Sequence, residues 1–265
     1  MTSDSPTLLP LDEARRDIDA IDDALLELLA KRFAMTERVR QAKASEGKSS
    51  PLPIRPTREA QIMRRLTARA TGLSLPPEFL VRLWRIILSQ SSLTQSKITL
   101  HVSRHLASNV AHRLRLRDYF GAMPVEEYRD EAQALTQINA QPADLCIVET
   151  EQPWAEAFID GRAGAAQVIA ALPALADGER MPRLLVLGEA ATSQTGDDET
   201  LVITKGKLPR DFAPQPHWQG KSGNLKLAAL PGFFLAHESP LVSLARSNSS
   251  LGLRIAGHYS RAIAI

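Results

Sequence analysis

The sequence predicts a multidomain protein, with an all-α domain over residues 1–97 and an α/β or α+β domain over residues 98–265. Two observations predict this division. Apolar residues recur at helical spacing before Lys97, and short β-type runs alternate with helix-like stretches after it. The chain has 265 residues, of which 44% are hydrophobic and 23% charged, so each domain can bury a core.

The first domain is expected to contain one very long helix, one short helix and one of middle length. In the long helix Ile18, Leu25 and Val39 lie on one apolar stripe, and neither Gly nor Pro interrupts the pattern. A loop with three prolines follows it, and Thr57 is placed to cap the second helix. The expected helices cover residues 11–44, 57–70 and about 76–97.

The second domain is expected to form a sheet covered by helices. Residues 225–265 have a β-α-β pattern. Further β-type runs cover residues 98–102, 144–148, 168–172, 183–187 and 200–204. His101 and His105 are four positions apart, but the first of these runs would place them on different elements, so no metal pair is expected.

Charge and cysteine content exclude several classes of protein. Residues 1–97 hold 16 basic and 12 acidic residues (net +4), and the remainder has net −2, which favours a small anionic ligand over nucleic acid. The chain lacks a run of eighteen apolar residues, so no membrane span is expected. The single cysteine, Cys146, allows no intrachain disulfide, and residues 1–10 do not resemble a secretory signal. We therefore expect a cytoplasmic protein.

Two cations interrupt the apolar stripe of the long helix. Arg32 and Lys43 point into the same sector as Leu25 and Val39, and a buried cation is costly unless it is paired. These side chains could extend past the helix interface to water, pair with a carboxylate of a neighbouring helix, or bind an anionic ligand. The pattern leaves these alternatives open.

Further polar residues lie on the other two helices. Ser91 and Gln95 are spaced i, i+4 and project together, and Arg58 and Glu59 begin the second helix. Such faces, without a Cys/His cluster or a nucleophile next to a base, indicate a polar pocket for an anion and no metal site. Arg15 lies seventeen positions before Arg32, about 25 Å along a straight helix, so it could complete that pocket only from a second copy.

These residues resemble the signature of the all-α chorismate mutase family. The resemblance covers about residues 8–97, and it rests on the segment 15–32, Lys43, the Arg58-Glu59 pair and the segment 91–95. It implies an intertwined three-helix homodimer with two active sites, each completed by an arginine of the partner. It also implies rearrangement of chorismate to prephenate, in phenylalanine and tyrosine biosynthesis, without a cofactor.

The resemblance implies a role for each residue. Arg15 and Arg32 resemble the carboxylate clamps, Lys43 and Gln95 the donors to the ether oxygen, and Glu59 the acceptor of the ring hydroxyl. Ser91 resembles a contact to the ring carboxylate, and Arg58 supports the charged pocket. Many relatives have an aspartate where this chain has Arg55, which puts one hydrogen bond to the substrate hydroxyl in doubt.

The second domain resembles a degenerate prephenate dehydratase with a structural or regulatory role. Residues 182–188 and 196–202 carry this resemblance, but the threonine of the family's Thr-Arg-Phe motif is replaced by Pro182. One alternative is therefore a bifunctional chorismate mutase and prephenate dehydratase. An alternative of another class is a helical dimerisation module that binds DNA. Its phosphate contacts would be Arg58, Arg64, Arg65, Arg69, Arg82 and Arg85.

Overall fold

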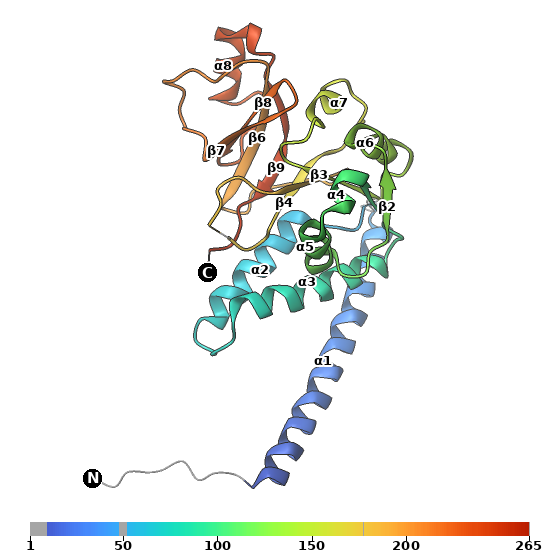
Figure 1. The fold of residues 1–265 in the computed structure, drawn as a ribbon. Helices are drawn as coiled ribbons and strands as arrows, with labels where there is room; N and C mark the ends of the chain where they lie inside the picture. Colours follow the sequence, from blue (N-terminus) through green and yellow to red (C-terminus); the bar gives the residue numbers. More distant parts are fainter. Residues whose placement is uncertain (1–9, 48–51, 177, 265) are drawn as a thin grey trace, which may run out of the picture. The chain divides into compact units, whose positions relative to one another are not determined.

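The computed structural model describes residues 10–47, 52–176 and 178–264 (Figure 1). They divide into two compact units, Met1–Ser49 and Ser50–Ile265. The first unit contains one uninterrupted helix, α1 (Leu11–Ser45), which begins and ends within a residue of its expected limits. Within the described part of the chain no helix is both long and apolar enough to cross a membrane.

The second unit begins with a pair of helices, α2 (Pro56–Ala70) and α3 (Pro77–Leu93). Each starts with a proline at its first position, where the missing N–H costs no hydrogen bond. The pair packs through Met63, Val81 and Leu88.

Two expectations about these helices were wrong. The residue before α2 is Arg55, with no side-chain cap, and Thr57 instead bonds to a distant loop. Helix α3 ends at Leu93 rather than near Lys97, and the residues that follow form a turn in which the Gln95 N–H donates to the Ser92 carbonyl.

The rest of the second unit is a mixed nine-stranded sheet with the order β2-β1-β3-β5-β4-β9-β6-β8-β7. The five expected strands and the C-terminal β-α-β pattern are all present, and two polar edge strands, β2 and β7, were not expected. The strands are β1 (Leu100–Ser103), β2 (Val125–Tyr128), β3 (Leu145–Glu149), β4 (Gln167–Leu172), β5 (Leu184–Gly188), β6 (Asp198–Thr204), β7 (Trp218–Ser222), β8 (Leu225–Pro231) and β9 (Arg254–Ser260).

Short helices connect these strands. Strands β1, β2 and β3 are parallel, while β5, β6, β7 and β8 pair antiparallel to their neighbours. Helices α3 and α5 pack against each other, and α2 packs near β9 (Figure 1). The connecting helices are α4 (Arg104–Ser108), α5 (Val110–Phe120), α6 (Glu131–Ala140), α7 (Ala155–Ile159), α8 (Leu241–Ser247) and the 3-10 helix Ser249–Leu251. A helical segment followed by an α/β sheet domain confirms the predicted fold class.

The two halves of the sheet meet at the parallel pair β4 and β9, where Gly257 faces Val168. Gly257 has a φ of 150°, and a Cβ built there would lie 2.1 Å from the Val168 carbonyl oxygen. Only glycine permits this approach. Apolar clusters that include Leu185 and Val186 on opposite faces of β5 form the core around this half of the sheet.

The predicted domain boundary after residue 97 stays a prediction. Helices α2 and α3 belong to the same compact unit as the sheet, but compactness alone does not show which segment folds independently.

Candidate active site

Three of the predicted site residues, Arg15, Arg32 and Lys43, lie on α1. Arg15 is exposed and forms an ion pair with Asp12, at 3.5 Å between Nη1 and Oδ1. The side chain of Lys43 lies outside the part of the chain that the structure describes. The other four predicted residues belong to the second unit, so the assembly of all seven into one pocket stays a prediction.

Arg58 and Glu59 lie in the first turn of α2, as expected. Arg58 is exposed. The Glu59 carboxylate reaches back along the helix, and its Oε1 accepts the Arg55 N–H at 3.3 Å. This contact satisfies a backbone donor at the uncapped helix start and places a negative charge at the positive end of the helix dipole. Local helix geometry therefore fixes one oxygen of Glu59.

The other oxygen of Glu59 pairs with Arg85 of α3. The Nη1 of Arg85 donates to Glu59 Oε2 at 2.7 Å, and only 8% of the Arg85 side chain and 12% of the Glu59 side chain are exposed. The Arg85 guanidinium also lies 3.8 Å from the ring centroid of Tyr119, on α5. Burial raises the pKa of the Tyr119 hydroxyl above its usual range, and the nearby Arg85 charge opposes this effect. These three residues form a row from α2 through α3 to α5, in which Arg85 is buried and Glu59 and Tyr119 are partly buried.

Ser91 and Gln95 lie together at the end of α3. The Ser91 hydroxyl donates to the Ile87 carbonyl at 2.7 Å, and the Gln95 side-chain amide donates to the Ser91 carbonyl at 2.9 Å. The two residues are therefore close together, as expected, although Gln95 lies just beyond the last residue of α3. Ser91 is buried and Gln95 half-buried.

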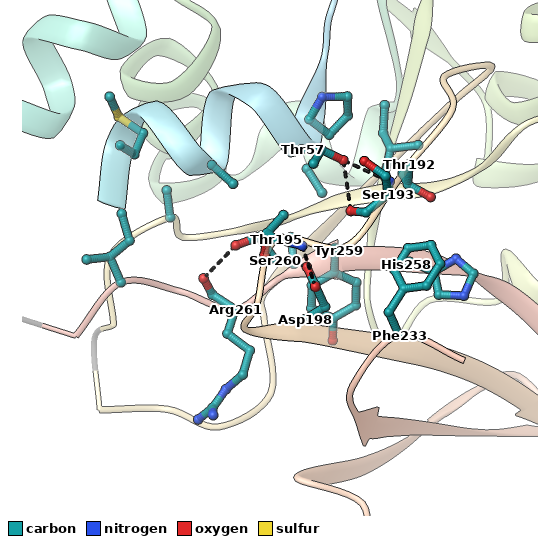
Figure 2. A pocket seen from close by; sticks show the side chains of 18 of the residues that line it. Thr57, Thr192, Ser193, Thr195, Asp198, Phe233, His258, Tyr259, Ser260 and Arg261 are labelled. Atoms are coloured by element: carbon teal, nitrogen blue, oxygen red, sulfur yellow. Dashed lines mark hydrogen bonds between the residues drawn. The ribbon is translucent and has the colours of Figure 1, made fainter. Parts of the chain in front are cut away.

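Two further contacts join α2 to the loop between β5 and β6. The Thr57 hydroxyl donates to the Ser193 carbonyl at 3.0 Å and accepts the Ser193 N–H at 2.9 Å (Figure 2). Two turns further on, Arg64 donates to Thr195 Oγ1, to the Asp197 carbonyl and to Ser260 Oγ, each at 2.6 Å.

The cavity between α2 and the sheet, lined by Thr57, Asp198 and His258 among others, has a volume of about 40 Å³ (Figure 2). That space suits one or two water molecules rather than an organic substrate.

A larger cleft of about 500 Å³ lies beside β6, β9 and the loop before β5. Its wall includes Glu199, whose buried carboxylate accepts from Trp218 Nε1 at 3.1 Å and from the Tyr259 hydroxyl. Burial and the Glu199 charge both raise the pKa of Tyr259 well above its usual range. His217 Nδ1 lies 2.9 Å from the same carboxylate. This contact holds the His217 ring in one orientation in the wall of the cleft.

Two histidines, His105 and His112, lie near the carboxyl ends of β1 and β3. His105 and His112 lie 3.6 and 3.5 Å from the two oxygens of Glu149. Burial lowers the pKa of His112, and the Glu149 charge partly offsets this. His101 lies on β1 and His105 on α4, as the sequence indicated, and no group of three or more possible metal ligands occurs among the described residues.

Comparison with known proteins finds similarity in the N-terminal region. Residues 14–96 match the family model described as chorismate mutase type II. Over 78 residues the chain is 36% identical to the T-protein of Enterobacter agglomerans, a match that covers 29% of this chain and a fifth, 20%, of that protein.

Two solved structures are similar to the larger part of the chain. One is a prephenate dehydratase from Streptococcus mutans (TM-score 0.37, 14% identity, 64% of this chain and 100% of that one). The other is GqqA, described as a novel type of quorum quenching acylase (TM-score 0.37, 12% identity, 63% of this chain and 96% of that one). TM-scores this low carry no argument about activity. The family match therefore concerns the first part of the chain: residues 14–96 are similar to the chorismate mutase type II family.

Proposed function

We propose that this protein is a chorismate mutase that acts as a homodimer in the cytoplasm, in phenylalanine and tyrosine biosynthesis. The observation that carries the proposal is the family match over residues 14–96, since this stretch contains all seven predicted site residues, from Arg15 to Gln95.

The reaction suits the chemistry of these residues. Chorismate is a dianion, and its intramolecular rearrangement needs a fixed conformation and stabilisation of charge on the breaking ether oxygen. Arg32 and the partner subunit's Arg15 hold the carboxylates, because guanidinium groups bind carboxylates with two parallel hydrogen bonds. Lys43 and Gln95 donate to the ether oxygen. Glu59 accepts a hydrogen bond from the ring hydroxyl, Ser91 contacts the ring carboxylate, and Arg58 supports the charged pocket.

The surface of α1 supports the homodimer. Ile18, Leu25, Leu28 and Val39, which share one side of the helix, are each half or more exposed in the single chain. A stripe of this length is unfavourable in water and suits a second copy of the same helix.

A coupled assay tests the reaction. The purified chain is incubated with chorismate, and the loss of chorismate is followed together with the appearance of prephenate and phenylpyruvate. We expect chorismate to be converted to prephenate without added cofactor. A chain that is folded and does not consume chorismate would refute the proposal. Accumulation of phenylpyruvate would instead favour the bifunctional alternative, in which Pro182 stands where the dehydratase family has a threonine.

The DNA-binding alternative has less support. Of the six arginines it requires, Arg85 is buried against Glu59 and Arg64 is bonded to the β5–β6 loop, so neither is placed to contact phosphates.

A heterodimer tests the shared site. Arg15→Ala and Arg32→Ala should each be inactive alone, because each removes a carboxylate clamp. If the two residues belong to pockets shared between subunits, one pocket of the mixed dimer carries both lesions and the other carries neither. Mixing under conditions that exchange subunits should then restore activity, up to half of the wild-type value per heterodimer. No recovery, with heterodimers detected by mass spectrometry, would show that Arg15 does not serve the partner's pocket.

A further inference from the structure

The Glu59 carboxylate has a hydrogen-bond partner at each of its two oxygens. One oxygen accepts the Arg55 N–H, the other accepts Arg85 Nη1, and 12% of the side chain is exposed. A carboxylate offers about four lone-pair positions on its two oxygens, so both contacts leave room for a further donor. Glu59 can therefore accept a hydrogen bond from a substrate hydroxyl while its contacts with Arg55 and Arg85 remain in place.

Arg85 is itself positioned by the α/β part of the chain. Its guanidinium lies between Glu59 and the ring of Tyr119, at 3.8 Å from the ring centroid. Among the described residues its buried Nε has no hydrogen-bond partner, so the ion pair and the aromatic ring are the contacts that orient the group.

Stability alone does not account for this arrangement. A buried ion pair can often be replaced by apolar side chains of similar size without loss of stability, because burying two charges costs about as much as their attraction returns. At a binding site, however, a fixed cation beside a carboxylate holds its oxygens in one orientation.

We propose that Arg85 is a positioning residue for the mutase reaction: it holds the Glu59 carboxylate in the orientation that accepts a hydrogen bond from the ring hydroxyl of the substrate, and Tyr119 of α5 holds Arg85. The inference rests on the proposed function. Because Tyr119 follows the predicted domain boundary, the α/β domain then sets the geometry of one part of the mutase site.

A double-mutant cycle tests whether Arg85 acts through Glu59. The full chain, Arg85→Gln, Glu59→Gln and the double variant are compared by kcat/KM for chorismate, at a temperature where circular dichroism shows each to be folded. We expect Arg85→Gln to lower kcat/KM about tenfold or more in the wild-type background. In the Glu59→Gln background the same change should have less than about a twofold effect, because the group that Arg85 positions is already replaced.

Arg82→Gln is the matched control. Arg82 lies on the same helix and pairs with Asp118 of α5 at 3.5 Å, but both side chains are more than half exposed. This change should leave kcat/KM unchanged. Should Arg85→Gln fail to fold, Arg85→Lys serves in its place, since lysine keeps the charge but loses the planar fork that stacks on the ring.

Two variants of Tyr119 test the contribution of the second domain. Tyr119→Leu removes the ring and should lower kcat/KM in the wild-type background only, whereas Tyr119→Phe keeps the ring face and should retain activity. An Arg85→Gln effect of equal size in both backgrounds, or a fully active Tyr119→Leu, would overturn the inference. A wild-type chain without mutase activity refutes the proposed function itself, and a fully active Glu59→Gln refutes the role of Glu59, so these failures are distinguishable.

Discussion

Replacing Arg64 with alanine removes the hydrogen bonds that join this part of α2 to the β5–β6 loop and to β9. The side chain is 24% exposed, and it donates to Thr195, Asp197 and Ser260 at 2.6 Å each. A hydrogen bond from a charged group contributes about 1.5–3 kcal/mol. Bonds that share one guanidinium are not additive, so we expect the free energy of unfolding to fall by about 2–4 kcal/mol. For a unit of this size that lowers the melting temperature by about 5–15 °C.

Differential scanning calorimetry of the full chain measures this loss. Arg65→Ala is the control, because Arg65 is the next residue of the same helix and is exposed. Surface changes of that kind stay within about 0.5 kcal/mol. If Arg64→Ala destabilises the chain no more than Arg65→Ala does, the contacts of Arg64 do not contribute to stability, and α2 is held in place by its other contacts.

Two further predictions concern β9. Burial lowers the pKa of His258 below its ordinary value of 6.5, and its Nε2 donates to the Phe234 carbonyl. The unfolded chain therefore binds more protons just below pH 6.5, so stability should fall as the pH falls through this range, and His258→Gln should reduce that slope in urea titrations. Gly257→Ala should destabilise the chain by more than about 3 kcal/mol, because its Cβ would overlap the Val168 backbone. Gly72→Ala, which meets open space, is the control in the same titrations.

Local signals predicted most of the fold. The two prolines at 76 and 77 located the start of α3, and buried strands such as β5 were visible as continuous apolar runs. The missed strands have no such signal. β2 (Val125–Tyr128) is a largely exposed edge strand with two glutamates, and β7 (Trp218–Ser222) exposes polar residues, so their pairing depends on neighbours that are distant in sequence.

Contacts with distant partners explain what sequence reasoning about the site missed. Thr57 was expected to cap α2, but its partner Ser193 lies 136 residues away. Arg85 was considered only as a possible phosphate contact. Its position did carry a signal, because it continues the buried stripe of Val81 and Leu88, the same pattern of a cation among apolar residues that singled out Arg32. That pattern could not predict that Arg85 pairs with Glu59, because the two residues lie on different helices.

The predicted boundary after residue 97 can be tested with a fragment. Residues 1–97 alone would lose the partners of Thr57 and Arg64 and the ring beneath Arg85, and would expose Leu52 and Ile54, which are buried in the core around β1 and β3. We expect the fragment to dimerise through α1 but to melt at a lower temperature and to have a lower kcat/KM than the full chain. Circular dichroism and the chorismate assay measure both. A fragment as stable and as active as the full chain would show that the contacts between α2, α3 and the sheet join two domains that fold and function independently.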